Sequence, residues 1–484
     1  MIILKKQRNF LVIAFLLLFT SIFHGCRQHA NPSGKSDALP LNTQRRFVIE
    51  HVNLIPMTSK NEVIRDATVV IDDNKIISIN GTVPDSAYVI NGKGKWLIPG
   101  LIDMHVHNLA STGFGKHYPT KAANFFVETQ DFMLLYVANG VTTTFELNGR
   151  AEHFGQRNEI AQRKAIGPRI ALAALIDGGD ATGMIANTPA DGRQIVRVAK
   201  GLGYEFIKVY SSLSTETFKA IIAEAAKEGM KVVGHIPDAF KGKLQEAFVP
   251  NFDLVAHAEE FAKQTTDFSD KDAARFAALA KRNGTWLSPT LVTMVRIAQQ
   301  ARTLDSVRNL PYLSYVHPLV QSKWLTANQY NRDTNPERVA YFDKLVEFHN
   351  RLVKAFEREG VPILAGTDAG TSGVVWGYAL HDELELLVKA GLTPEEALAS
   401  ATRLPATWLQ IDDKIGTIEA GKLADLVLLD ANPLENIENT RRISGVFFDG
   451  RWIVKPTIDS LLSDLSKRNL ANKQKFDWQK RNDQ

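Results

Sequence analysis

Short apolar runs of β-strand type alternate with longer helical patterns through residues 97–411. The apolar runs end near His107, Glu146, Ala174, Tyr210, Ile236, His257, Pro289 and Thr367, and the clearest helical patterns cover 215–228, 271–283, 336–360 and 393–401. Eight strands that alternate with helices predict an α/β fold, a (β/α)8 barrel of TIM type, with an open doubly wound sheet as the alternative. A barrel of this type carries its functional side chains at the carboxyl ends of its strands.

Strand-rich sequence flanks this region on both sides. Residues 46–96 contain short alternating runs broken by turn signals, and a similar pattern returns at 412–456. We therefore expect a small composite β-sandwich domain that is assembled from both ends of the chain. The 484 residues exceed what one hydrophobic core of ~250–300 residues needs, which agrees with two domains. Residues 457–484 begin with an amphipathic pattern and predict a C-terminal helical tail.

The first 26 residues have the pattern of an export signal. Three basic residues precede the apolar run 10–23, which is shorter than a membrane-spanning helix requires. The run ends near Cys26, the only cysteine, and this arrangement resembles the lipid-attachment site of a bacterial lipoprotein. Ordinary cleavage and an uncleaved anchor helix are the alternatives. We expect a flexible tether at 27–45 and an exported protein held by its lipid at the periplasmic or cell-surface side of a membrane.

The composition limits the partners of this chain. A net charge of +4 over 484 residues, with no basic stripe, argues against nucleic acid as a partner. A single cysteine allows no disulfide framework, so the hydrophobic core has to hold the fold. The expected partners are a small-molecule or dipeptide substrate and, through the lipid anchor, a membrane. The sequence leaves a homo-oligomer open.

Two histidines, His105 and His107, follow an apolar run that contains a Pro-Gly break. Residues i and i+2 of a strand point to the same face, so both imidazoles converge on one point at the end of the first barrel strand. Converging imidazoles suit Zn²⁺ and similar ions. A His-x-His motif is weak evidence by itself, and its value depends on what the other strands bring to the same place.

Four further residues lie at or near the ends of predicted strands: Lys208, His235, His257 and Asp368. Lys208 shares one strand face with Phe206 and Tyr210, and a lysine in so apolar a setting is costly unless it is paired or neutral. Each of these residues is a weak signal alone. Barrel geometry brings all of them to one mouth, in the order His-x-His, Lys, His, His and Asp.

In this order, the motifs resemble those of the amidohydrolase superfamily, in the branch related to imidazolonepropionase and to metal-dependent prolidases. The matching stretches are Pro-Gly-Leu-Ile-Asp-Met-His-Val-His at 99–107, Gly-Val-Thr-Thr-Thr at 140–144, Gly-Thr-Asp-Ala-Gly at 366–370, Gly-Leu-Thr-Pro-Glu-Glu-Ala-Leu at 391–398, Gly-Thr-Ile-Glu-Ala-Gly-Lys-Leu-Ala-Asp-Leu-Val at 416–427 and Asn-Pro-Leu at 432–434. The resemblance spans about 47–454. Phe145-Glu146 departs from it, because the family often has Arg-Asp there, and we expect Glu146 to cap a helix or to meet a cationic substrate group.

The resemblance implies a set of metal ligands. His105, His107 and Asp368 correspond to ligands of one divalent metal, and His235 and His257 to ligands of a second. Lys208 corresponds to the lysine whose carbamate, N6-carboxylysine, bridges two metals, and an unmodified Lys208 that reaches the substrate is the alternative. In a mononuclear site, the metal would lie with His105, His107, His235 and Asp368, and His257 would contact the substrate. Zinc is the expected metal.

The predicted activity is metal-dependent hydrolysis of a carbon–nitrogen bond, an amide of a dipeptide or of a small cyclic molecule. Asp368 would take the proton from the attacking water, and Tyr210 and His257 would stabilise the oxyanion. A surface lipoprotein that binds a ligand without catalysis is the alternative. We expect the histidines outside the site (His117, His153, His317 and His349) to face solvent. The long interval 292–360 predicts either a lid over the barrel mouth or a packed helical pair.

Overall fold

The structure is a computed structural model, and it describes residues 45–108, 128–179 and 184–480. The predicted export signal 1–26, its lipidation site Cys26 and residues 27–44 of the predicted tether lie outside the described residues, as does His117. Within the described ranges, every helix is too short or too polar to cross a membrane.

Seven parallel strands form the barrel, and each is hydrogen-bonded to the next in the same order as in the sequence. They are β6 (Leu101–Val106), β7 (Val141–Glu146), β8 (Arg169–Asp177), β10 (Phe206–Val209), β11 (Lys231–Gly234), β12 (Phe252–Ala256) and β13 (Trp286–Ser288). A short strand, β9 (Met184–Ile185), pairs with the end of β8. The alternation of strands and helices in the sequence correctly predicts this part of the fold.

Residues 363–369 take the position of the eighth strand and close the barrel. Ile363 forms a parallel bridge to Leu287 of β13, and Ala369 forms one to Val106 of β6. The segment is irregular where a regular strand was predicted, because the backbone N–H groups of Thr367 and Asp368 both donate to one carbonyl, that of His105. The ladder is therefore interrupted at the point where Asp368 leaves it.

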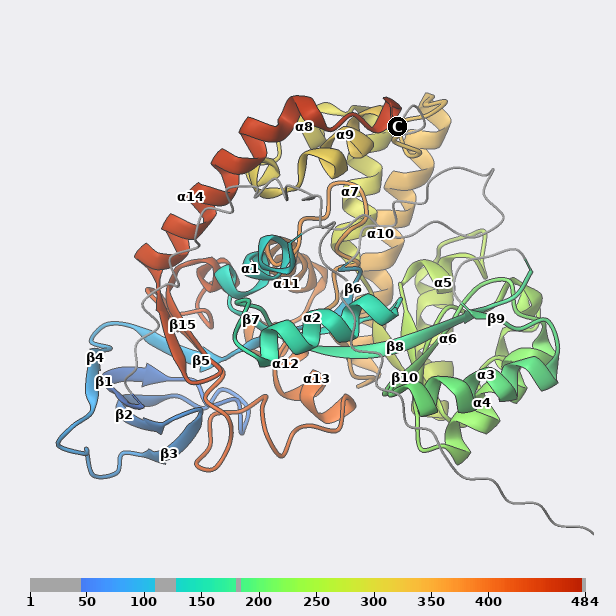
Figure 1. Ribbon diagram of the computed structural model, residues 1–484. Helices are drawn as coiled ribbons and strands as arrows, with labels where there is room; N and C mark the ends of the chain where they lie inside the picture. The colour runs from blue at the N-terminus through green and yellow to red at the C-terminus, as the bar shows by residue number, and fades with distance from the viewer. Residues whose placement is uncertain (1–44, 109–127, 180–183, 481–484) are drawn as a thin grey trace, which may run out of the picture. The chain divides into compact units, whose positions relative to one another are not determined.

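Helices follow most of the strands and cover the barrel (Figure 1). They are α1 (Thr129–Ala138), α2 (Ala151–Ala161), α3 (Pro189–Leu202), α4 (Thr215–Lys227), α5 (Glu259–Ala262), α6 (Asp270–Asn283), α7 (Leu291–Arg302), α8 (Asp305–Arg308), α9 (Pro318–Thr326), α10 (Pro336–Arg358), α11 (Tyr378–Ala390), α12 (Pro394–Ser400) and α13 (Arg403–Trp408). The ends of α4, α6, α10 and α12 differ from the predicted helical ranges by no more than two residues. Side-chain caps explain several starts, since Ser214, Ser269 and Asn335 each accept a backbone N–H of the first turn.

A second sheet combines strands from both ends of the chain. Its order is β16–β15–β14–β5–β1–β2–β3, and β4 pairs with β1. The strands are β1 (Arg46–Leu54), β2 (Ile64–Asp72), β3 (Lys75–Ile79), β4 (Tyr88–Asn91), β5 (Trp96–Pro99), β14 (Leu426–Leu429), β15 (Ile443–Phe448) and β16 (Arg451–Val454). Figure 1 shows the blue N-terminal strands beside the red β15, and the antiparallel pairing of β14 with β5 joins the two groups. The composite β domain is confirmed.

Apolar packing separates the mouth of the barrel from its base. One buried cluster includes Ile102, Phe145 and Phe206 from the barrel strands and Trp408 from α13. The last helix, α14 (Lys455–Asn472), buries Ile458, Leu462, Leu465 and Asn469 and runs along one side of the molecule in Figure 1. With the base filled, the cavity that holds the candidate site lies at the other end of the barrel strands.

Candidate active site

His105, His107 and Asp368 form a compact group at the mouth of the barrel. One ligand atom from each lies within 4.8 Å of the others. Nε2 of His107 is 3.0 Å from Oδ1 of Asp368, and Nε2 of His105 is 3.4 Å from the same oxygen. His105 is fully buried, and neither of its ring nitrogens has a hydrogen-bond partner among the described residues. Two nitrogens and one carboxylate oxygen therefore face one point, which is the donor set of a divalent metal site.

Buried contacts hold Asp368 in this position. Asp103 accepts the backbone N–H of Thr367 at 3.0 Å and its hydroxyl at 2.7 Å, and also accepts the N–H of His105 at 3.2 Å. Burial raises the pKa of Asp103 to about 7. A Cβ atom at Gly366 would lie 2.5 Å from Oγ of Ser288 on β13 and 2.9 Å from Cβ of His105 on β6, so the close approach of this segment to both strands requires glycine. The backbone of Asp368 is left-handed, with φ of 56°, a conformation that aspartate and asparagine adopt more readily than most other residues.

His257 follows β12 and lies against His105, with ring centroids 4.5 Å apart. Its Nδ1 is 2.9 Å from Oγ1 of Thr290, which donates its only proton to the carbonyl of Pro289 at 2.8 Å. His257 therefore donates from Nδ1, and the lone pair on its Nε2 is free for a ligand. Burial lowers the pKa of His257 to about 3, so the ring is neutral. This state suits metal ligation better than donation of a hydrogen bond to an oxyanion.

His235 follows β11 and stands 5.0 Å from His257, centroid to centroid. Its Nδ1 lies 3.1 Å from Oε1 of Glu260 and 2.9 Å from the hydroxyl of Ser211, while its buried Nε2 has no partner within the described part of the chain. Burial, followed by the nearby Lys208, holds the pKa of His235 well below its usual value. A neutral imidazole with one free nitrogen is the form that binds a metal.

Lys208 is 1% exposed, and no carboxylate of the described residues lies within ion-pairing distance of it. Burial lowers the pKa of its amine to about 8, against the attraction of Asp368 and Glu260. Its Nζ is 6.0 Å from the ring centroid of Tyr210, which in turn packs 4.0 Å from the ring of His235. Burial raises the pKa of Tyr210 to about 12, so its hydroxyl keeps its proton and can donate.

The expected roles of Glu146 are wrong. It is buried at the end of β7, before α2 begins at Ala151, and it neither caps that helix nor faces the cavity. Its carboxylate lies 3.4 Å from Nδ1 of His107 and 3.3 Å from Nε2 of His153. Burial raises the pKa of Glu146, but the neighbouring His153 and His107 outweigh it and hold the pKa below its usual range. His153, predicted to face solvent, is therefore part of the support of the site.

All six predicted metal ligands, together with Tyr210, line one cavity of about 500 Å³. Residues 327–330, which we call its roof, line this cavity. Asn328 binds Gln300 of α7 at 2.7 Å and Ser372 at 3.0 Å, and Asn331 binds the carbonyl of Gln300 at 2.8 Å. Within the interval 292–360, α7 and α10 pack together, which agrees with the expected packed helical pair, and residues 327–330 between them line the cavity.

The prediction for His349 is also wrong. It is 2% exposed, on the inner face of α10, and it lines the cavity. The periodicity of α10 carries the signal that would have found it, because Leu345, His349 and Leu352 recur at helical spacing on the buried face. His317, which was also expected to face solvent, is partly buried and caps α9 by accepting the N–H of Leu319.

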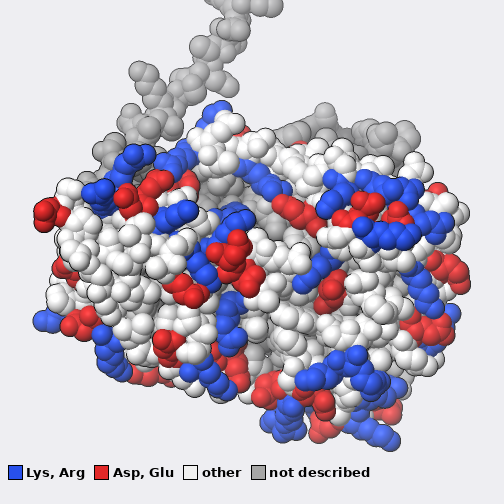
Figure 2. All heavy atoms as spheres, turned by 90° about the horizontal axis from the view of Figure 1, so that it is seen from below, with Lys and Arg blue, Asp and Glu red and all other residues white. Residues whose placement is uncertain are grey.

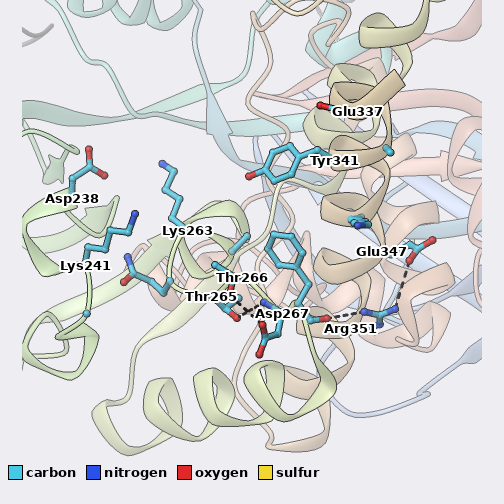
Figure 3. A pocket seen from close by; sticks show the side chains of 16 residues that line it. Asp238, Lys241, Lys263, Thr265, Thr266, Asp267, Glu337, Tyr341, Glu347 and Arg351 are labelled. Atoms are coloured by element: carbon cyan, nitrogen blue, oxygen red, sulfur yellow. Dashed lines mark hydrogen bonds and ion pairs between the residues drawn. The ribbon is translucent and has the colours of Figure 1, made fainter. Parts of the chain in front are cut away.

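A larger hollow of about 1440 Å³ lies beside the cavity but contains none of the six predicted ligands (Figure 3). Helix α5 contributes to both spaces, since Glu259 lines the cavity and Ala262 lines this groove. Figure 3 shows Lys263 and Tyr341 on opposite sides of the groove. On the face of the molecule in Figure 2, acidic and basic groups are interspersed, which agrees with the low net charge.

Comparisons with known proteins agree with this geometry. The sequence profile of the Amidohydrolase family matches residues 96–453. An imidazolonepropionase from Cupriavidus necator is 25% identical over 399 residues, which cover 79% of this chain and 88% of that protein.

Solved structures show the same fold. A bottromycin amidohydrolase superposes with a TM-score of 0.69 at 23% identity and covers 90% of this chain and 92% of its own. A Xaa-Pro dipeptidase with methionine bound in its active site has a TM-score of 0.63 at 23% identity and covers 84% of this chain and all of its own.

Proposed function

Since this chain belongs to the amidohydrolase family, we propose that it is a metal-dependent hydrolase that cleaves an amide bond of a dipeptide or another small molecule. One observation carries the proposal. Nitrogens of His105 and His107 and an oxygen of Asp368 converge within 4.8 Å at the carboxyl ends of the barrel strands, and the ring nitrogens of His105 have no other partner among the described residues.

The residues present fit a divalent metal, for which zinc is the first candidate. His105, His107 and Asp368 would hold it, and His235 and His257 offer free nitrogens for a second ion or for a larger coordination sphere. When bound, such an ion lowers the pKa of a water molecule toward ~7 and polarises a carbonyl group. The fixed Nδ1 contacts of His235 and His257 direct Nε2 of each ring toward the cavity, as in other metal sites with histidine ligands.

The protein side chains would move the proton and hold the substrate. Asp368 would accept a proton from the attacking water and pass it to the leaving nitrogen. Its Oδ2 already accepts the hydroxyl of Thr371 at 3.0 Å, which keeps the carboxylate oriented. Tyr210 keeps its proton and would donate to the developing oxyanion.

Lys208 is the proposed carbamate. Its neutral amine would add to carbon dioxide and release one proton, and burial favours the neutral amine by lowering its pKa to about 8. The carbamate would place an anion among the four imidazoles of His105, His107, His235 and His257, and it would offer oxygen atoms as further metal ligands. Binding of two ions per chain therefore goes together with modification of Lys208 in this proposal.

The substrate has to be small. A cavity of about 500 Å³ is within the usual range for small-molecule sites, and the hydrogen bonds of Asn328 and Asn331 fix its roof. A dipeptide or a cyclic amide fits this space, whereas a folded protein does not.

The first test is metal content by elemental analysis, followed by hydrolysis assays on dipeptides and cyclic amides. About two ions per chain would support the bridged site, and about one would support the mononuclear arrangement. Asp368→Asn should abolish turnover and retain much of the metal. A protein that binds no metal after incubation with zinc or manganese in bicarbonate would exclude this hydrolase and favour a non-catalytic ligand-binding lipoprotein.

We also propose that the protein is exported and anchored in a membrane through a lipid on Cys26. The pattern of residues 1–26 supports this proposal. Cys26→Ser should abolish incorporation of a labelled fatty acid and release the protein from the membrane fraction. Equal labelling of the wild-type protein and the Cys26→Ser variant would exclude Cys26 as the lipidation site.

A further inference from the structure

Behind His107, on the side away from the cavity, the carboxylate of Glu146 is surrounded by four nitrogen atoms. The backbone N–H of Asn148 donates to Oε1 at 2.8 Å, and that of Asn108 donates to Oε2 at 2.6 Å. Nδ1 of His107 is 3.4 Å from Oε1, and Nε2 of His153 is 3.3 Å from Oε2. Each oxygen therefore meets one backbone donor and one imidazole, which uses the acceptor capacity of a carboxylate.

The tautomer of His153 follows from its other nitrogen. The backbone N–H of Arg150 donates to Nδ1 of His153 at 2.9 Å, at the start of α2. Nδ1 must offer its lone pair to this donor, so a neutral ring carries its proton on Nε2, on the side of Glu146. His153 is 1% exposed and fixed in the first turn of a helix, so its Nε2 is held 3.3 Å from Oε2, at ion-pairing distance but without hydrogen-bond geometry.

The same reasoning runs from Glu146 to His107. With both oxygens engaged, the carboxylate cannot rotate without losing a backbone contact. It accepts from Nδ1 of His107 and thereby leaves Nε2, which lies 3.0 Å from Asp368, as the nitrogen that faces the ligand group. A carboxylate behind a ligating histidine is a general means of fixing the orientation and the basicity of the ring.

We propose that Glu146 and His153 are positioning residues for His107, and that His153 controls metal affinity through Glu146 although it lies outside the cavity. This inference rests on the proposed function, because His107 has to be a metal ligand. Glutamate is one methylene longer than the aspartate that the family often has here, and in this chain its carboxylate spans the ends of β6 and β7 and the start of α2.

The test measures the affinity of the metal-free full-length chain for Zn²⁺ alone, by competition with a chelator, together with thermal unfolding of each variant. His153→Phe should weaken Zn²⁺ binding about 10–100-fold, the usual cost of removing an outer partner of a ligand. His153→Gln should recover part of the loss, because its amide can donate to Glu146.

His381→Phe is the matched control. His381 is also 1% exposed and makes one side-chain hydrogen bond, from Nδ1 to Thr440 at 2.9 Å, but it lies on α11 and does not line the cavity. The control should lower thermal stability to a similar degree and leave Zn²⁺ affinity within about twofold, since it has no contact with a ligand.

Three results would overturn the inference. A folded His153→Phe protein with wild-type Zn²⁺ affinity would show that the pair does not position His107. An equal loss of affinity in His381→Phe would show a general effect of destabilisation. If the wild-type chain binds no Zn²⁺, both the inference and the proposed function are wrong. In the first two results the wild-type chain does bind Zn²⁺, so only the inference is wrong. Should His153→Phe not fold, His153→Leu against His381→Leu makes the same comparison.

Discussion

His107 and His235 each have a buried glutamate behind Nδ1, but the two carboxylates have different surroundings. Glu146, behind His107, meets only imidazoles and backbone N–H groups among the described residues. Glu260, behind His235, accepts the N–H of Ile236 at 3.1 Å and pairs with the ammonium of Lys263 at 2.7 Å. The carboxylate on the first side is enclosed by the protein (the closed side), and the one on the second side is paired with Lys263, which lines the groove (the groove side).

The pKa values of the two carboxyl groups reflect this difference. Burial raises the pKa of Glu146, but His153 and His107 outweigh burial and keep it ionised. Burial raises the pKa of Glu260 to about 7, because the opposing effect of the partly exposed Lys263 is smaller than the effect of burial. Two glutamates with nearly equal burial can therefore differ in charge at neutral pH, and the neighbours of each carboxylate decide which one is a fixed anion.

The largest expected difference is in stability. Glu146→Gln presents one carbonyl oxygen and one amide to four nitrogen groups, so it breaks a buried charged network, at a cost of about 3–5 kcal/mol. Glu260→Gln replaces a carboxyl group whose pKa burial raises to about 7, so less charge is lost than at Glu146, and it should cost about 1 kcal/mol. Urea unfolding of the metal-free proteins at pH 7 measures both values. An equal loss in the two variants would contradict the distinction between the closed side and the groove side.

The sequence predicts the parts of this site that depend on local periodicity. His105 and His107 share a strand face because they are two residues apart, and His235, His257 and Asp368 come directly after apolar runs that form the barrel. The alternation of strands and helices then brings these residues together, because barrel geometry places the carboxyl ends of all the strands at one mouth independently of the loop conformations. The closing segment was harder to predict, because two N–H groups share the carbonyl of His105 and interrupt the ladder.

The supports of the ligands were not predicted, because they depend on contacts between residues distant in sequence. Glu146 is the last residue of β7, and its role as a support is not evident until its contacts to Asn108 and His153 are known. A partial signal exists for His153, since it shares the buried face of α2 with Gln156 and Ile160 at helical spacing. A single histidine in a polar helix was interpreted as exposed, although the periodicity of its neighbours favours the interior.

Acid should lower the free energy of unfolding through His349 of α10. This helix also forms one wall of the groove (Figure 3). Burial lowers the pKa of His349 to about 3, against about 6.5 in the unfolded chain. The unfolded state therefore binds more protons below pH 6.5, and stability falls as the pH falls from 6.5 toward 3.

His349→Leu should remove about 2 kcal/mol of this loss between pH 6.5 and pH 4.5. Neither ring nitrogen of His349 has a partner within the described residues, so the variant should be about as stable as the wild type at pH 7.5. Urea unfolding at several pH values measures the effect. If the free energy of unfolding of the two proteins changes with pH in parallel, His349 does not gain a proton on unfolding and does not cause the loss of stability in acid.

The smallest expected effect concerns Lys263, whose side chain is 34% exposed in the groove. A partly exposed ion pair contributes about 0.2–1 kcal/mol and is screened by salt. Lys263→Met should therefore weaken Zn²⁺ binding by no more than about fivefold at low salt, because Glu260 then holds His235 less firmly, and the difference from wild type should shrink at high salt.

Lys219→Met is the control for Lys263, since it removes the same charge from an ion pair with Glu246 that has no contact with His235. It should leave Zn²⁺ affinity unchanged at every salt concentration. Glu146 and His153 are each only 1% exposed, so the effect of His153→Phe should not depend on salt. The losses of Zn²⁺ affinity in Lys263→Met and in His153→Phe are compared at several salt concentrations. If both shrink equally at high salt, solvent screens both carboxylates, and the proposed difference between the two sides of the site is wrong.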